Sequence, residues 1–434
     1  MLADGGFVAV QREEDADLVL FNTCCVREHA EERVYNRMQQ LAKLKIQRPA
    51  LILAVGGCMA QKEGTNILDR LPHVDLVFGT GALYEVPELV NRVITHGGPV
   101  VSVDAGVRPM RSQAEFDMRE SAIRAWVSIA EGCDNRCAYC VVPMVRGAER
   151  SKPPGLILDE VSRASEKGHA EIFLLGQNVN SYGHDLAGAP DFPGLLELVN
   201  DVPGVKRIRF TTSHPKDMST RLVEALRDLP RVCEHLHLPL QSGSSRILNV
   251  MNRGYSREDY LRKIERLRSA VPNIGLTTDI IVGFPGETDE DFEQTRSALA
   301  EIRFDTAYIF KFSPRPGTPA ETLRAGMPEN VIVHRHKTLL DMQKEISREK
   351  ARQLVGTQQK VLVAARCEKA LGYVIGRTRG YRVVRVRSDE AQVGDEVETV
   401  ITEARGWTLY GTPAAAVRYA SPSVDPVHAK AESE

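Results

Sequence analysis

The segment Glu131–Gly147, EGCDNRCAYCVVPMVRG, guides the interpretation of the rest of the chain. It carries Cys133, Cys137 and Cys140, three of the eight cysteines of the chain, in a C-x-x-x-C-x-x-C spacing. Zinc sites commonly use four ligands in two separated pairs, and the nearest downstream histidine, His169, is distant in sequence. Three thiolates on one loop suit a 4Fe–4S cluster that keeps one iron free for another ligand. A zinc site and a metal-free loop remain the alternatives.

This segment follows the first of six apolar strands that alternate with helical patterns between residues 119 and 350. The strands are predicted at Trp126–Ile129, Ile172–Leu175, Ile208–Phe210, His235–Leu238, Thr277–Val282 and Ala307–Phe312. Helices are predicted at Ser256–Ser269, Asp289–Glu301 and 328–354. Six βα units are too few for the eight-stranded barrel, so we predict an α/β fold with a partial (β/α)6 barrel. Its site should lie at the carboxyl ends of the strands.

Residues 1–105 show a second strand–helix alternation, which predicts an N-terminal open parallel α/β sheet domain. Its strands are expected at Leu18–Phe21, Leu51–Val55, Leu76–Phe78 and Val100–Val103. A helix is indicated by the apolar stripe of Ala30, Val34, Met38 and Leu41. Residues 104–118 lack periodicity and are interpreted as a linker.

Residues 353–418 are predicted to form a small all-β barrel, followed by a disordered tail at 419–434. Its strands are expected at Lys360–Cys367, Tyr373–Gly376, Tyr381–Arg387 and Asp395–Thr402. Five arginines lie within eleven residues near two tyrosines: Arg377, Arg379, Arg382, Arg385 and Arg387. Basic and aromatic side chains together suit phosphate contacts and base stacking in RNA. The alternative is a solvated, charged hairpin.

Composition limits the classes of protein that remain. The chain has 434 residues, with 56 Lys plus Arg against 58 Asp plus Glu and a net charge of −2. This balance excludes a uniformly basic nucleic-acid coat but allows a local basic patch. No stretch approaches the roughly 18 apolar residues of a membrane span. The start MLADGGFVAV has no basic region and reaches Asp4 at once, so we expect no secretory signal there. We therefore expect a cytoplasmic protein.

The cysteine spacing, with the aromatic Tyr139 before the last cysteine, resembles the radical S-adenosylmethionine (SAM) enzymes. The resemblance implies that Cys133, Cys137 and Cys140 bind three irons while SAM chelates the fourth. Reductive cleavage of SAM would then give a 5′-deoxyadenosyl radical. Turns with glycines and amides after four strands fit a bound SAM. The cofactor-binding residues that we expect are Tyr139, Gly176, Gln177, Asn178, Ser213, Gln241 and Gly283.

A wider set of collinear motifs resembles the tRNA methylthiotransferase family over residues 1 to about 418. They are NTCCVREHAEERV, GGCMAQKEG, VDLVFGT, LLGQNVNSYG, SHPKDM, HLPLQSGS and DIIVGFPGET. The resemblance implies addition of a methylthio group to carbon 2 of a prenylated adenosine next to the anticodon. It also implies that the last domain is an RNA-binding TRAM barrel. The partners it implies are tRNA and a low-potential flavodoxin- or ferredoxin-type electron donor, with no membrane and a monomeric protein.

The family also implies a second, auxiliary 4Fe–4S cluster in the N-terminal domain, held by three cysteines. Two matching positions are Cys24 and Cys58, which follow predicted parallel strands. We expect the third ligand upstream of residue 1, together with a first strand of the sheet. Cys25 is the alternative third ligand, although adjacent side chains usually point apart.

Three other functions remain open. Enzymes of the same architecture act on threonylcarbamoyl-adenosine in tRNA or on an aspartate of a ribosomal protein. The segment VREHAEERV after the NTC motif favours the dimethylallyl branch, and the cationic last domain argues against the ribosomal one. A chain without its auxiliary cluster would be only a tRNA-binding protein.

Overall fold

The computed structural model describes residues 2–3, 5–25, 28–103, 110, 121–323, 326–368 and 370–414, with only the backbone of residues 28–30. The linker predicted at 104–118, apart from Met110, and the tail predicted at 419–434 lie outside these residues. The chain divides into two compact units. The first contains residues 1–111, 132–135 and 140–148, and the second contains 112–131, 136–139 and 149–434. No described helix has the length and apolarity that a bilayer span requires.

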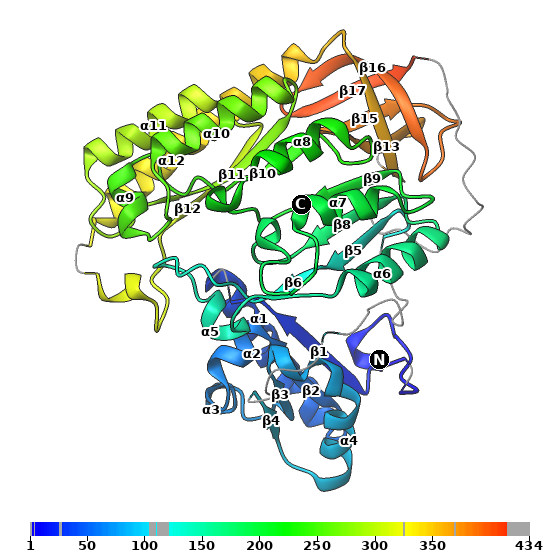
Figure 1. Ribbon diagram of the computed structural model, residues 1–434. Helices are drawn as coiled ribbons and strands as arrows, with labels where there is room; N and C mark the ends of the chain where they lie inside the picture. Colours follow the sequence, from blue (N-terminus) through cyan, green and yellow to red (C-terminus); the bar gives the residue numbers. More distant parts are fainter. Residues whose placement is uncertain are drawn as a thin grey trace. The chain divides into compact units, whose positions relative to one another are not determined.

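The first unit is built on a parallel sheet in the order β1-β2-β3-β4 (Figure 1). The strands are β1 Leu18–Thr23, β2 Ile52–Gly57, β3 Leu76–Phe78 and β4 Val100–Ser102. The helices are α1 Glu28–Gln47, α2 Cys58–Glu63, α3 Asn66–Arg70, α4 Val86–His96 and α5 Val142–Arg146. The four predicted strands are confirmed to within two residues. Strand β2 is buried on both faces, since Leu53 packs with helix α1 and Ile52 packs with helix α4.

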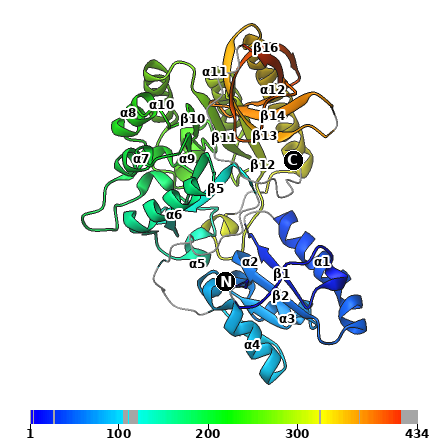
Figure 2. The same cartoon turned by 90° about the vertical axis from the view of Figure 1, so that its right-hand side faces the viewer.

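The second unit contains the six predicted strands of the partial barrel, each followed by at least one helix (Figures 1 and 2). The strands are β5 Arg124–Ser128, β8 Glu171–Leu175, β9 Arg207–Phe210, β10 His235–His237, β11 Gly275–Val282 and β12 Thr306–Lys311. The helices are α6 Pro154–Glu166, α7 Phe192–Asn200, α8 Thr220–Asp228, α9 Ser245–Val250, α10 Arg257–Ala270, α11 Asp289–Ile302 and α12 Glu329–Gln353. A short ribbon pairs β6 Ala130–Glu131 with β7 Arg150–Ser151.

The barrel strands form two parallel three-stranded sheets, β5-β8-β9 and β10-β11-β12. Strands β9 and β10 do not pair directly. Between them β9 makes only an isolated bridge, which joins Ile208 to Val232 in the segment before β10. One apolar core nevertheless runs through both sheets and the helices that cover them. The partial barrel is therefore a single packed body with an interrupted backbone ladder.

The C-terminal part of the second unit is a closed barrel in the order β13-β14-β15-β17-β16. Its strands are β13 Gln358–Arg366, β14 Tyr373–Thr378, β15 Val383–Arg387, β16 Glu396–Arg405 and β17 Thr408–Pro413. Sequence analysis missed β17 because Gly411 and Pro413 weaken the strand pattern. Gly411 is needed there, since a Cβ atom at this position would lie 2.5 Å from the Val400 carbonyl oxygen. Strand β17 pairs parallel with β15 and closes the barrel.

Candidate active site

The segment around Cys137 is held by the turn that follows helix α9. Ala138 donates its backbone N–H to the Met251 carbonyl at 2.9 Å, and the Asn252 side-chain amide donates to the Arg136 carbonyl at 2.8 Å. Asn252 has a φ of 56°, a left-handed conformation that asparagine tolerates. The backbone on both sides of Cys137 is therefore fixed by the barrel.

Arg253, the next residue of this turn, contacts the cysteine itself. Its Nη1 lies 3.2 Å from Sγ of Cys137, and its Nε donates to the Tyr255 hydroxyl at 3.1 Å. Burial by itself lowers the pKa of this guanidinium, but the groups around it, Tyr139 foremost, raise the pKa overall. A charged guanidinium therefore faces the sulfur. Sequence analysis missed Arg253, because in an alternating helical region nothing marks one arginine among many.

Cys133 and Cys140 are grouped with the first unit. The Asn135 amide donates to Sγ of Cys133 at 3.5 Å, and the Val142 backbone N–H donates to Sγ of Cys140 at 3.5 Å. Cys133 is buried and Cys140 is half-buried. N–H donors of this kind stabilise thiolates and orient them for metal ligation.

Tyr139, one of the seven predicted SAM-binding residues, lies in the cysteine segment, with its ring edge to face with Phe284 at 6.5 Å. The other six follow four strands of the barrel. They are Gly176, Gln177 and Asn178 after β8, Ser213 after β9, Gln241 after β10 and Gly283 after β11. Because these strands are parallel to their neighbours, the residues gather at the carboxyl ends of the strands. This is the end at which barrel enzymes place their sites.

Three buried polar atoms at this end have no hydrogen-bond partner among the described residues: Asn178 Oδ1, Ser213 Oγ and His214 Nε2. Burial lowers the pKa of His214 to about 2, so the ring is neutral. Its Nδ1 accepts the Lys216 backbone N–H at 3.2 Å, which assigns the ring proton to Nε2. Native proteins rarely leave such atoms unpaired, so a polar ligand at this end would satisfy them.

Two residues at this end have strained backbones. Thr212 has a φ of 65° and Gln241 has a φ of 67°. For a β-branched threonine a positive φ is an outlier, and such strain concentrates at functional sites. The Gln241 side-chain amide makes no hydrogen bond to any residue that the structure describes, which leaves it available to a ligand.

The two predicted glycines, Gly176 and Gly283, differ in whether packing requires a glycine at their position. A Cβ atom at Gly176 would meet Val179 at 3.4 Å, an ordinary contact, so packing alone does not require glycine there. Gly283 has a φ of 72°, and its Cβ atom would lie 2.8 Å from Ile332. Gly283 is therefore explained by helix α12, whereas the bare backbone at Gly176 favours close approach of a ligand.

In the first unit, Cys24 and Cys58 follow two strands at matching positions. Thr23 and Gly57, the residues before them, are paired in register between β1 and β2. The Cys24 side chain is exposed, whereas Cys25 is buried beside Cys58. The expectation that adjacent cysteines point apart is met, but the side chain that approaches Cys58 belongs to Cys25.

The environment of Cys58 favours its thiolate. A hydrogen bond from the Cys25 thiol and the charge of Arg146 lower the pKa of Cys58 to about 6, although burial opposes the shift. Arg146 Nε lies 3.3 Å from Sγ of Cys58. Val141 and Val145, which follow Cys140 along the chain, pack against the same pair of thiols. No local sequence pattern distinguishes Arg146 within the VVPMVRG segment, so its role was not predicted.

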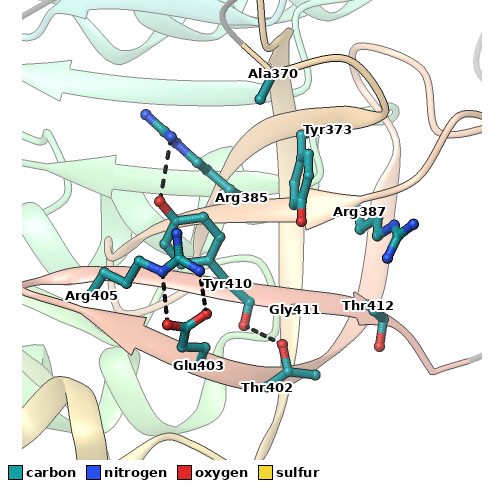
Figure 3. Close-up of a pocket in the computed structure, with 10 residues that line it drawn as sticks. All are labelled: Ala370, Tyr373, Arg385, Arg387, Thr402, Glu403, Arg405, Tyr410, Gly411 and Thr412. Atoms are coloured by element: carbon teal, nitrogen blue, oxygen red, sulfur yellow. Dashed lines mark hydrogen bonds and ion pairs between the residues drawn. The ribbon is translucent and has the colours of Figure 1, made fainter.

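The five arginines predicted to bind RNA fall into two groups. Arg385 and Arg387 line a pocket of about 290 Å³ in the C-terminal barrel together with Tyr373 and Tyr410 (Figure 3). The two tyrosine rings meet edge to face at 6.4 Å. Arg385 donates to the Tyr410 hydroxyl at 3.4 Å. Neither Arg385 nor Arg387 pairs with a described carboxylate.

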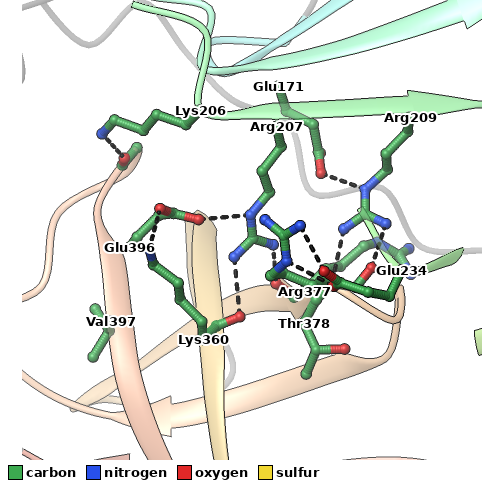
Figure 4. A network of polar contacts seen from close by, with 12 residues as sticks. Glu171, Lys206, Arg207, Arg209, Glu234, Lys360, Arg377, Thr378, Glu396 and Val397 are labelled. Atoms are coloured by element: carbon green, nitrogen blue, oxygen red, sulfur yellow. Dashed lines mark hydrogen bonds and ion pairs between the residues drawn. The ribbon is translucent and has the colours of Figure 1, made fainter. Parts of the chain in front are cut away.

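The other three arginines are engaged inside the second unit. Arg379 pairs with Glu234 at 2.7 Å, Arg382 pairs with Asp305, and Arg377 lies over the Tyr381 ring. The same segment is fastened to the amino ends of the partial-barrel strands by a polar network, in which Arg207 and Arg209 of β9 donate to the carbonyls of residues 377–379 (Figure 4). RNA binding by all five remains a prediction, and the structure gives these three an intramolecular role.

Comparison with known proteins shows which family the chain belongs to. A tRNA-2-methylthio-N(6)-dimethylallyladenosine synthase of Pelotomaculum thermopropionicum is 45% identical over 407 residues, which cover 93% of this chain and 91% of the relative. The chain belongs to this family of synthases. Synthases of Acetivibrio thermocellus and Moorella thermoacetica are 45% and 44% identical and each match 95% of this chain, over 86% and 93% of their own lengths.

Three family models match successive parts of the chain. Residues 127–299 match the Radical SAM superfamily, residues 352–414 match the TRAM domain, and residues 1–79 match the uncharacterized protein family UPF0004. The fold also resembles the radical SAM methyltransferase TsrM of Kitasatospora setae, with a TM-score of 0.52 and 14% identity. That match covers 80% of this chain and 68% of the methyltransferase, and at this identity it shows the fold alone.

The residues present fit the cluster and the SAM that a radical SAM enzyme uses. The cysteine sulfurs receive N–H donors, and unpaired polar atoms lie at the strand ends where a cofactor would bind. In the part of the chain that the structure describes, no group of three His, Cys, Asp or Glu side chains is arranged to hold a metal ion. Cys133, Cys137 and Cys140 would hold the radical SAM cluster, which together with SAM would supply radical chemistry.

Proposed function

We propose that this chain adds a methylthio group to carbon 2 of a prenylated adenosine next to the anticodon of tRNA. The identity of 45% to a synthase over 93% of the chain carries this proposal. When bound, the radical SAM cluster and SAM supply the radical that removes hydrogen from the adenosine. We also propose a flavodoxin- or ferredoxin-type electron donor, a monomeric protein and action in the cytoplasm, where tRNA is found.

We propose that Cys24 and Cys58 hold an auxiliary 4Fe–4S cluster. Their positions after paired strands and the lowered pKa of Cys58 support this assignment. Cys25 lies against Cys58 and is a candidate for the remaining protein ligand. Val141 and Val145 would cover this site with apolar side chains, which limits the access of water to the sulfur that is transferred.

A deletion strain tests the proposed function. We expect tRNA nucleosides of a strain lacking this gene to lose the methylthio group of prenylated adenosine and to keep the prenyl group. Loss of methylthio-threonylcarbamoyl-adenosine instead would indicate that the enzyme acts on threonylcarbamoyl-adenosine in tRNA. Loss of the methylthio group from a ribosomal protein would indicate that the enzyme acts on an aspartate of that protein. If no methylthio group disappears, the chain only binds tRNA.

We expect tRNA to bind at the pocket of the TRAM barrel that Tyr373, Tyr410, Arg385 and Arg387 line. Its tyrosine rings can stack a base, while Arg385 and Arg387 can meet a phosphate. We expect Tyr373→Ala to weaken tRNA binding about tenfold, in the range measured for loss of one stacked base. Arg385→Ala should reduce the slope of log affinity against log salt by about 1. Filter binding over a salt series measures both effects.

The matched control is Arg366→Ala, which removes an exposed arginine of the same barrel outside the pocket. It should leave both the affinity and the slope close to those of the parent. Parent-like affinity in the Tyr373 variant, with an unchanged circular dichroism spectrum, would show that RNA does not use this pocket.

A further inference from the structure

The guanidinium of Arg253 is a buried charge without a carboxylate partner. The residue is 4% exposed, and no described carboxylate lies within ion-pairing distance. Its hydrogen bonds go to Sγ of Cys137, the Tyr255 hydroxyl and, at 3.4 Å, the Pro239 carbonyl. All three groups are neutral unless the thiol is ionised.

Other buried arginines of the second unit have a carboxylate partner, as a buried charge normally requires. Four of comparable burial each pair with a glutamate: Arg124 and Arg209 with Glu171, Arg207 with Glu396, and Arg335 with Glu287. Burying an unpaired charge is costly, because protein groups replace the lost hydration only in part. The contrast indicates that the counter-charge of Arg253 is the ionised sulfur of Cys137 and the anionic cluster it would ligate.

We propose that Arg253 is a positioning residue that orients the Cys137 thiolate and raises the reduction potential of the radical SAM cluster. The reduced cluster carries one more negative charge than the oxidised cluster. A fixed positive charge and an N–H donor at one of its sulfurs therefore stabilise the reduced state more. The low local dielectric of a buried site strengthens this effect.

Arginine suits this role better than lysine would. Its planar fork reaches the sulfur, a hydroxyl and a carbonyl at once, which holds the charge at a fixed distance from the cluster. The Tyr255 hydroxyl is itself 2.9 Å from the Leu240 carbonyl, so the turn after β10 braces the guanidinium. A charge held in this way contributes the same field in every turnover.

The test is a potentiometric titration of the reconstituted cluster, followed by electron paramagnetic resonance without SAM or tRNA. Arg253→Gln, Arg253→Lys and the control Arg257→Gln are compared in a background of Cys24→Ala and Cys58→Ala, which isolates the radical SAM cluster. Arg257 suits the control because it pairs with Glu301 and the Gln294 carbonyl, away from the cysteines. Iron content is measured for every sample.

We expect the midpoint of Arg253→Gln to move about 59 mV more negative, the one-electron equivalent of a tenfold loss of reduced cluster at a fixed potential. Arg253→Lys should shift less, and Arg257→Gln should match the parent. An unchanged midpoint in a fully loaded Arg253→Gln would overturn the proposal. Should that variant hold no iron, the neutral Arg253→Met decides, since a parent-like midpoint in that variant, once loaded, would overturn the proposal as well.

This inference rests on the radical SAM cluster of the proposed function but not on its substrate. A shifted midpoint together with unmodified tRNA would leave the role of Arg253 intact and reject the methylthiolation. An unshifted midpoint together with modified tRNA would support the methylthiolation and reject the role of Arg253.

Discussion

Alanine at Cys133, Cys137 and Cys140 together is expected to remove about four irons per chain and to abolish the modification of tRNA. Removing all three thiolates deletes every protein ligand of the radical SAM cluster. Iron and sulfide are measured after anaerobic reconstitution. The parent is expected to hold about eight irons if the auxiliary cluster also assembles, and about four if it does not.

Cys367→Ala is the control for this experiment. Cys367 is buried in the TRAM barrel, far along the chain from the cluster motifs, so its loss should leave the iron content unchanged. Full iron content in the triple variant would contradict the assignment of these cysteines. Four irons in the parent and none in the triple variant would show that Cys24 and Cys58 do not suffice for a second cluster.

The second large effect is expected at Arg209, which joins the partial barrel to the TRAM barrel. Its Nε pairs with Glu171 at 2.6 Å, and its two Nη atoms donate to the Thr378 and Arg379 carbonyls at 2.8 and 2.7 Å. Arg209→Ala removes the donor to the Arg379 carbonyl and leaves the Thr378 carbonyl with the Tyr381 backbone N–H alone. It also leaves the buried Glu171 with one cation, Arg124. We expect a loss of about 3 kcal/mol in the free energy of unfolding, at the lower end for a broken buried pair.

Urea unfolding measures this loss, and limited proteolysis shows whether the TRAM barrel is released. Burial raises the pKa of Glu171, but Arg209 and Arg124 lower it overall from its ordinary value of 4.5. A depressed pKa gives stability that is present above that ordinary value and is lost as the pH falls through the folded value. The difference between parent and Arg209→Ala should therefore shrink on acidification below about pH 4.5.

Arg366→Ala provides the matched control, because it removes an exposed arginine that makes one hydrogen bond to Gln392. Its stability should change by no more than about 0.5 kcal/mol. An Arg209 variant as stable as this control would mean that the polar network does not hold the two barrels together.

Local sequence patterns predicted most of the fold. Apolar runs such as Leu76–Phe78 coincide with β3, because a strand buried on both faces must be apolar throughout. The cysteine spacing predicted a radical SAM domain, which the match of residues 127–299 to that superfamily confirms. Strand β17 was missed because Gly411 and Pro413 weaken its strand pattern, and only its pairing with β15 in the folded barrel reveals it.

Contacts between distant residues were the part that sequence could not predict. Arg253 and Cys137 are 116 positions apart, and Arg146 and Cys58 are 88 positions apart. Arginines that are clustered in sequence suggest an RNA-binding patch. The sequence does not show whether their side chains face solvent or a neighbouring domain. Only the fold separates Arg379, which pairs with Glu234, from Arg385, which lines the pocket.

The most direct measurement of the central claim uses the purified, reconstituted chain under anaerobic conditions with SAM and a reductant. Three tRNA substrates are compared, which carry dimethylallyl-adenosine, unmodified adenosine or threonylcarbamoyl-adenosine next to the anticodon. Mass spectrometry of the nucleosides should show a methylthio group in place of hydrogen on dimethylallyl-adenosine alone. A methylthio group on threonylcarbamoyl-adenosine, or cleavage of SAM with no modified nucleoside, would contradict the account.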